Sequence, residues 1–172
     1  MGDAAHLVKR FFGSIVPIGP AKEDEAWART HLLDGEQEVW ARMSRNDRRH
    51  AVGVAKRAEA SLGVEATRPV VAAALLHDCG KAVSGLGTYG RVIATLSVKL
   101  AGRDIAMAWS ETRGFTRRVG LYVEHPRLGA DLLGLAGSAP LTVAWVAEHH
   151  LPPEEWTVPR TIGEALKAAD DD

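Results

Sequence analysis

An imidazole and a carboxylate stand side by side where an apolar run of this chain ends. The run 73–76 leads directly into His77 and Asp78, and Gly80 and Lys81 follow. Neighbouring positions on a helix point about 100° apart, so both side chains can face one cavity. A carboxylate in such a place can bridge two cations. The pair therefore indicates a metal site at the end of a buried helix.

Five of the seven histidines fall on expected core helices or at their ends, and these are His50, His77, His125, His149 and His150. The intervals between them each span roughly one helix and its return, and helical bundles build metal sites from one or two such side chains per helix. Mixed imidazole and carboxylate ligands suit Fe, Mn, Zn, Co or Ni better than Mg alone. His6 and His31 have no partner in this pattern, so we treat them as ordinary surface or packing residues.

A further carboxylate, Asp170, lies near the end of the chain. It follows Leu166 and Ala169 on an amphipathic segment, whereas Asp171 is one residue out of phase. The simpler interpretation is a solvated acidic tail over 170–172. The phase favours Asp170 as an inward-facing ligand.

Taken in order, these residues resemble the HD-domain superfamily of metal-dependent phosphohydrolases. The pattern of that family is a His, a His-Asp pair and a distal Asp, matched here by His50, His77-Asp78 and Asp170. The context 75–81 is similar to the family's apolar-apolar-His-Asp-x-x-Lys. The resemblance covers about residues 44–170.

Two further features resemble the members of this family that hold two metals. One is His125-Pro126 followed by Gly129-Ala130, and the other is Glu148-His149-His150. The resemblance implies one or two divalent transition metals (Fe, Mn, Co, Ni or Zn). The implied ligands are His50, His77, Asp78, His125, His149, His150 and Asp170.

The same resemblance implies a hydrolysis in which two metals acidify a water for in-line attack on phosphorus. Asp78 would bridge the metals, and Lys81 would neutralise a phosphate oxygen or protonate the leaving group. Arg127, two residues after His125, is a second candidate for binding phosphate. His150 stays between ligand and proton carrier. The expected partner is a small-molecule phosphoester or nucleotide, with no stable binding of nucleic acid.

Two other functions remain open. A minority of two-metal HD proteins hold mixed-valent iron and cleave C–C or C–P bonds with O₂, and the same ligand set serves both chemistries. A non-catalytic module that binds a nucleotide or a metal is the third possibility. Cleavage of cyclic dinucleotides is disfavoured, because Leu151-Pro152-Pro153 follows the paired histidines where that branch has Gly-Tyr-Pro.

Composition sets the outer limits. A chain of 172 residues with 46% hydrophobic and 25% charged residues fits one globular domain. The net charge of −1 gives no overall basic field for nucleic acid or an acidic membrane. Cys79 is the one cysteine, so no internal disulfide can form, and a reducing cytoplasm fits best. We expect no membrane partner, because no segment approaches the roughly 20 apolar residues of a transmembrane helix.

The beginning of the chain faintly imitates a secretion signal, since Lys9 and Arg10 precede an apolar stretch. Gly13 and Pro17 interrupt that stretch and no small-residue cleavage site follows, which disfavours the signal.

The single cysteine, Cys79, is interpreted as a packing residue. The five tryptophans read as core and lid anchors.

Apolar residues recur at three- and four-residue steps through most of the chain, which predicts an all-α, single-domain bundle of roughly eight to ten helices. We expect an N-terminal helical extension over 1–43, packed on an HD-like helical domain over 44–172. The expected helices are 4–12, 23–33, 36–43, 44–62, 67–78, 89–101, 103–110, 115–124, 128–135, 140–150 and 161–170.

Local signals place several helix ends. Ser44 with Asp47 is a weak capping box, and Thr161 with Glu164 is a better one. His125 precedes a proline, which disfavours helical geometry and predicts a break there.

Overall fold

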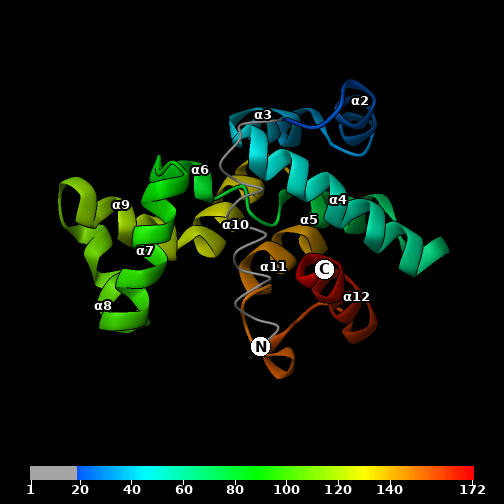
Figure 1. Cartoon of the computed structure of the whole chain (residues 1–172). Coiled ribbons are helices and arrows are strands. Elements are labelled where there is room, and N and C mark those ends of the chain that lie inside the picture. Colours follow the sequence, from blue (N-terminus) through cyan, green and yellow to red (C-terminus); the bar gives the residue numbers. More distant parts are fainter. Residues whose placement is uncertain (1–18) are drawn as a thin grey trace.

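Helices form all the regular secondary structure of residues 19–172, the part of the chain that the structure, a computed structural model, describes (Figure 1). The predicted all-α class is confirmed. The expected helix over 4–12 and the possible signal sequence lie outside the described residues. The helices are α2 Lys22–Thr30, α3 Asp34–Arg42, α4 Arg45–Leu62, α5 Arg68–Leu76, α6 Lys81–Ser84, α7 Thr88–Ala101, α8 Arg103–Ala108, α9 Gly114–Val123, α10 His125–Leu135, α11 Pro140–Glu148 and α12 Arg160–Asp171.

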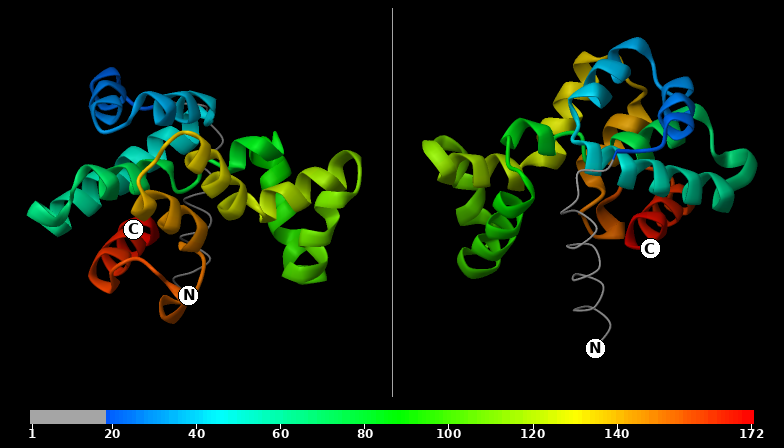
Figure 2. Two further views of the ribbon diagram at one scale, coloured as in Figure 1. Left: turned by 180° about the vertical axis from the view of Figure 1, so that it is seen from behind. Right: turned by 45° about the horizontal axis from the view of Figure 1, so that its top comes forward.

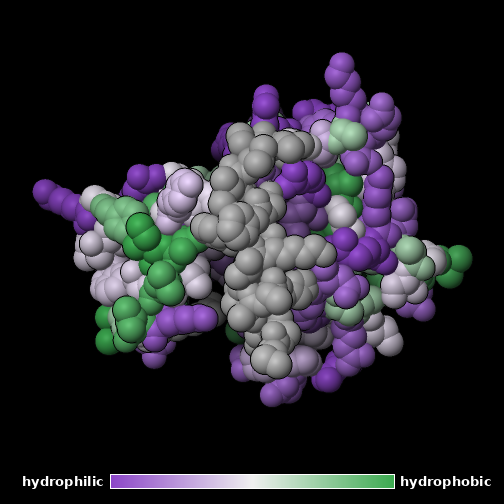
Figure 3. Space-filling view, viewed as in Figure 1, coloured by the Kyte–Doolittle hydropathy of each residue, from purple (hydrophilic) through white to green (hydrophobic). Residues whose placement is uncertain are grey.

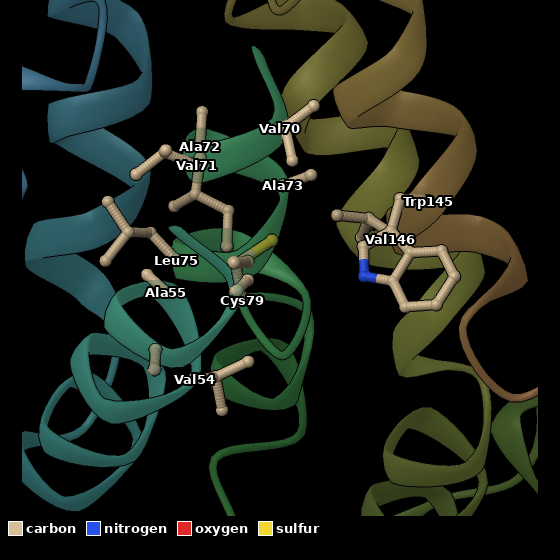
Figure 4. Close-up of a cluster of buried hydrophobic side chains, with 14 of the residues drawn as sticks. Val54, Ala55, Val70, Val71, Ala72, Ala73, Leu75, Cys79, Trp145 and Val146 are labelled. Atoms are coloured by element: carbon tan, nitrogen blue, oxygen red, sulfur yellow. The ribbon is translucent and has the colours of Figure 1, made fainter. Parts of the chain in front are cut away.

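Helix α5 is the centre of the molecule. Every residue from Val70 to Leu76 is buried, because α4 and α11 pack against this helix on two sides. Figure 4 shows Val54 and Ala55 of α4 on one side of α5, and Trp145 and Val146 of α11 on the other. A helix that is apolar all round must be enclosed in this way. It therefore carries the residues at its C-terminal end into the interior.

The helices that precede α4 share the same core. Trp40 of α3 is fully buried, and its indole Nε1 donates to Glu25 Oε1 of α2 at 2.9 Å. Glu36 is also fully buried, and its carboxylate accepts hydrogen bonds from the Leu33 amide at 2.8 Å and from Arg68 at 3.1 Å. Helices α2 and α3 and the turn between them thus contribute Ala28, Leu32, Val39 and Trp40 to the main hydrophobic core. All five tryptophans lie in hydrophobic clusters.

Two of the three predictions about helix ends need correction. Ser44 does cap α4, since its Oγ accepts from the Asp47 amide at 3.1 Å. The capping box at Thr161 is wrong: α12 begins one residue earlier, after Pro159, and Glu164 bonds Arg160 instead. The break before α10 falls at 124, and His125 is itself the first helical residue. A proline in the first turn is tolerated because the amide it lacks has no partner there.

Helices α7, α8 and α9 form a lobe that stands beside the rest of the bundle in all three ribbon views (Figures 1 and 2). A small cluster of its own, Leu86, Ala94 and Val119, lies inside the lobe. An ion pair fastens the lobe to α4: Arg91 donates to the two carboxylate oxygens of Asp47 at 2.6 and 2.8 Å. Among the described helices, none has the length and apolar character that spanning a membrane requires.

Candidate metal centre

Five helices, and the residues that directly follow two of them, bring polar side chains to one place at the C-terminal end of α5. The side chains come from α4, from the end of α5 and the turn after it, from the start of α10, from the end of α11 and the residue after it, and from the last turn of α12. They are His50, His77, Asp78, His125, His149, His150 and Asp170. The structure therefore brings together all seven predicted ligands, although they span 120 positions of sequence.

Asp78 is at the middle of the group. Its Oδ1 lies 3.4 Å from His125 Nε2 and 3.9 Å from His149 Nε2, and its Oδ2 lies 3.4 Å from His77 Nε2. The carboxylate is buried, so its two oxygens face two different sets of imidazoles in an interior setting. This is the arrangement expected of a carboxylate that bridges two cations.

Asp170 closes the side of the group that faces α4. Its Oδ1 lies 2.8 Å from His50 Nε2 and 3.5 Å from His77 Nε2. Asp171, by contrast, is exposed and pairs with Lys167 at 3.0 Å. The distal carboxylate is thus directed inward and the one after it outward, as the phase of the helix predicted.

The three buried histidines are held in the same way. Each uses Nδ1 to bond the backbone carbonyl three residues earlier, and because a carbonyl only accepts, Nδ1 must carry the proton. Nε2 is then the ring atom with a free lone pair when the imidazole is neutral. The pairs are His77 with Ala74 at 2.9 Å, His125 with Tyr122 at 2.7 Å and His149 with Val146 at 2.9 Å.

All three of these Nε2 atoms are buried and lack a hydrogen-bond partner within the described part of the chain. Buried polar atoms are nearly always satisfied, so three exceptions at one point require an explanation. A cation among them supplies it, because a metal-ligating histidine typically directs its second ring nitrogen to a carbonyl, as these do. The donor set therefore fits a transition metal.

The donors divide into two sets. His50, His77 and Asp78 offer atoms within 4.8 Å of one another, and so do His125, His149 and His150. His150 is exposed, whereas His125 and His149 are buried. Two groups that meet at Asp78 match a centre with two metal positions.

The electrostatics of the two sets differ. Burial opposes the charged form of His77, but Asp78 and Asp170 outweigh it and raise the pKa of that imidazole to about 10. Burial and the neighbouring His150 and His77 hold the pKa of His149 well below its usual value. One set is therefore rich in negative charge and the other consists of neutral imidazoles.

Lys81 lies directly against the bridging carboxylate. Its Nζ is 2.5 Å from Asp78 Oδ2. Burial opposes the ionisation of Asp78, yet Lys81 and His77 together hold the pKa of this carboxyl well below its usual range. The ammonium therefore lies at the edge of the centre, and its action on phosphate stays a prediction.

Two glycines allow α10 to approach the His-Asp turn. A Cβ on Gly80 would lie 2.0 Å from the carbonyl oxygen of His125, and one on Gly129 would lie 2.9 Å from Val146 Cγ1. Both distances are too short for any side chain. The absence of a side chain at Gly80 and at Gly129 therefore lets α10 approach closely enough for His125 to reach Asp78.

Two groups support the candidate ligands in a way that the sequence did not indicate. Arg57 of α4 donates through Nε and Nη2 to the carbonyl oxygen of Ala169, at 3.0 and 2.8 Å, and so holds the residue before Asp170. Glu148 accepts from the amide and the hydroxyl of Thr157, at 2.7 and 2.6 Å, and so fastens the loop after His150. Arg57 gave no local signal, because its partner lies 112 positions away.

Comparison with known proteins adds no assignment. No family model, curated protein or solved structure matches the chain. The centre is therefore interpreted from its own residues and their geometry.

Three other predicted residues have ordinary surroundings. The side chain of Arg127 is 60% exposed and pairs with Glu124 at 2.6 Å and Asp131 at 3.1 Å, so its role in binding phosphate stays a prediction. Cys79 is buried, and burial beside Asp78 raises the pKa of its thiol to about 12, which fits a packing residue. His31 bonds the Trp27 carbonyl at 3.0 Å.

Proposed function

We propose that this protein is a metal-dependent phosphohydrolase that cleaves a nucleotide or another small phosphoester. The observation that carries the proposal is the set of three buried, partnerless Nε2 atoms around one carboxylate. The ordered resemblance to HD-domain phosphohydrolases gives the proposal its reaction class.

In this proposal, His50, His77, Asp78 and Asp170 would hold one metal, and His125 and His149 would hold a second that shares Asp78, with His150 as a further ligand or a proton carrier. When bound, divalent transition metals lower the pKa of a water and polarise the phosphoryl group, so that hydrolysis proceeds near neutral pH. The imidazoles of His125 and His149 suit this role because burial keeps them neutral, the form that donates a lone pair.

Two further side chains complete the proposed site. The Lys81 ammonium, which lies 2.5 Å from Asp78 Oδ2 at the edge of the centre, would neutralise a phosphate oxygen or give its proton to the leaving group. His150 is exposed and its ring centroid lies 5.1 Å from that of His125, so it can exchange a proton with solvent beside the centre. Although the residue as a whole is exposed, its ring packs against that of His149, and loss of hydration first and His125 next lower its pKa to about 4.

The proposal is tested by elemental analysis of protein purified without chelator, followed by a panel of phosphoesters with Mn, Fe, Co or Ni added back. Asp78→Ala and Asp170→Ala are each expected to lose bound metal and essentially all hydrolysis while keeping the helical circular dichroism of the wild type. Asp171→Ala is the matched control, because this carboxylate is the exposed neighbour of Asp170, and it should keep both properties.

Full phosphatase activity in Asp78→Ala would contradict the assignment of the site. Redox-active iron with O₂ consumption and no phosphoester cleavage would instead favour the oxygenase chemistry that the same ligands can support. Metal and nucleotide binding without turnover of any substrate would favour a binding module.

A further inference from the structure

Helix α7 has its large apolar side chains on the outside. Tyr89, Ile93, Leu96 and Leu100 are 69, 50, 56 and 90% exposed, whereas the residue of α7 that is fully buried against the lobe is the small Ala94. An amphipathic helix on a monomer has the opposite arrangement, with its bulky apolar residues facing the core. Packing within the lobe therefore does not account for this exposed apolar stripe, which consists of Tyr89, Ile93, Leu96 and Leu100.

The stripe has the spacing of a helix–helix seam. Its members are separated by four, three and four residues, which is the alternation that keeps one face of a helix against a partner helix. Ile105 and Met107 of α8 are exposed as well. Figure 3 shows hydrophobic surface gathered over this lobe, in contrast to the largely hydrophilic surface over α2, α3 and α4.

The size of the patch matches a protein interface. At about 200 Å² for a large side chain, these six exposed residues present roughly 700 Å². The largest apolar patch of a typical monomer is about 300–600 Å². A standard interface buries about 800 Å² on each partner.

We infer that α7 is a dimerisation helix, and that two copies of this chain pair through it about a two-fold axis. In an antiparallel pair the two-fold axis passes between Ile93 and Leu96. Ile93 of one copy then meets Leu96 of the partner subunit, and Tyr89 meets Leu100 of the partner subunit. A closed two-fold interface of this kind uses the same patch on both copies.

Charge selects the antiparallel orientation. Lys99 is the exposed cation beside the stripe, and α7 contains no acidic residue. A parallel pair would place the two Lys99 ammonium groups side by side. With a rise of 1.5 Å per residue, the antiparallel pair separates their positions by about 13 Å along the helix axis and sets each near Tyr89 of the partner subunit, where a cation is favourable.

The charge of the whole lobe gives the proposal a distinctive salt dependence. Residues 88–118 contain Arg91, Lys99, Arg103, Arg113, Arg117 and Arg118 but only Asp104 and Glu111. Two such lobes repel each other, so added salt should screen the repulsion and strengthen an apolar dimer. A contact with an anionic partner would respond in the opposite direction.

Analytical ultracentrifugation of the full chain tests the proposal, from low micromolar to hundreds of micromolar protein and at low and high ionic strength. The wild type should reach twice the monomer mass, with a dissociation constant that is unchanged or lower at high salt. Leu96→Glu should weaken the dimer at least tenfold, since it buries a charge at the seam, and Ile93→Glu should do the same.

Thr95→Glu is the matched control. Thr95 is exposed and directly precedes Leu96, but it lies about 100° around the helix from it and so off the apolar stripe. This substitution should leave the dissociation constant within about twofold, and circular dichroism should show all variants equally helical. The proposal is overturned if the wild type stays a monomer at every concentration. It is also overturned if Thr95→Glu raises the dissociation constant as much as Leu96→Glu and Ile93→Glu do. Salt-sensitive binding of the monomer to phosphatidylglycerol vesicles, lost in Leu96→Glu, would overturn it too.

Discussion

Three imidazoles reach the centre with Nδ1 on the carbonyl of the preceding helical turn. This bond fixes the ring orientation and the tautomer before any ligand arrives. The cost is an unpartnered Nε2 in the interior, typically about 1–3 kcal/mol for each buried polar atom. Three such atoms lie around Asp78, and a cation bound among them would offset this cost.

Cys79, the residue directly after Asp78, is as buried as the candidate ligands around it. Cys79 is 1% exposed, so its thiol should resist alkylation in the native protein. We expect iodoacetamide to label it only when the chain unfolds, at a rate that follows global unfolding in urea. Mass spectrometry of the labelled peptide measures this. Rapid labelling of the folded protein would contradict the packing around the His-Asp turn.

At the scale of the elements, close backbone approach determines whether the two donor sets meet. Gly80→Ala should push α10 away from the turn after α5, because its Cβ would overlap the His125 carbonyl oxygen. Overpacking of this kind costs about 1–3 kcal/mol. We expect a lower melting temperature and loss of metal at the position that His125 serves, measured by calorimetry and elemental analysis.

Gly134→Ala is the control for that substitution. It also lies on α10, and a Cβ there meets nothing within 4 Å. Replacing a glycine inside a helix should stabilise the protein by about 0.5–1 kcal/mol and leave the metal content unchanged. If both variants keep full metal content, the glycine contact does not position His125.

The C-terminal helix depends on a clamp from α4. Arg57→Ala removes both hydrogen bonds to the Ala169 carbonyl, so Asp170 should be held less firmly. Loss of such a supporting group typically lowers metal affinity by about 10–100-fold. Isothermal titration with Mn or Co would measure it, with partial rescue in Arg57→Lys. Arg160→Ala, which changes an exposed arginine on α12 itself, should have no effect, and an equal loss there would contradict the clamp.

At the scale of the whole molecule, local sequence predicted the fold class and the approximate helices. Periodicity through Ala51, Val54, Ala55 and Ala58 marked α4, and Ser44 marked its start, because these signals depend on near neighbours alone. The predicted cap at Thr161 failed because Pro159 already fixes the chain before α12.

The residues that could hold a metal were predicted because their types and order carry information across the chain. Their supports were not. The Arg57 clamp and the Asp47–Arg91 ion pair join positions 112 and 44 apart, and nothing in the local sequence indicates which partner each arginine takes. The outward stripe of α7 had the periodicity of an ordinary amphipathic helix, and only the packing showed which face is exposed.

The most direct test of the account is a crystal structure of the metal-loaded protein with anomalous data collected at the absorption edge of the bound metal. We expect anomalous density beside Asp78, with one peak among the atoms of His50, His77 and Asp170 and a second among those of His125 and His149. Imidazoles in these positions with no anomalous density between them, in protein grown with excess Mn, Fe, Co or Ni, would contradict the central claim.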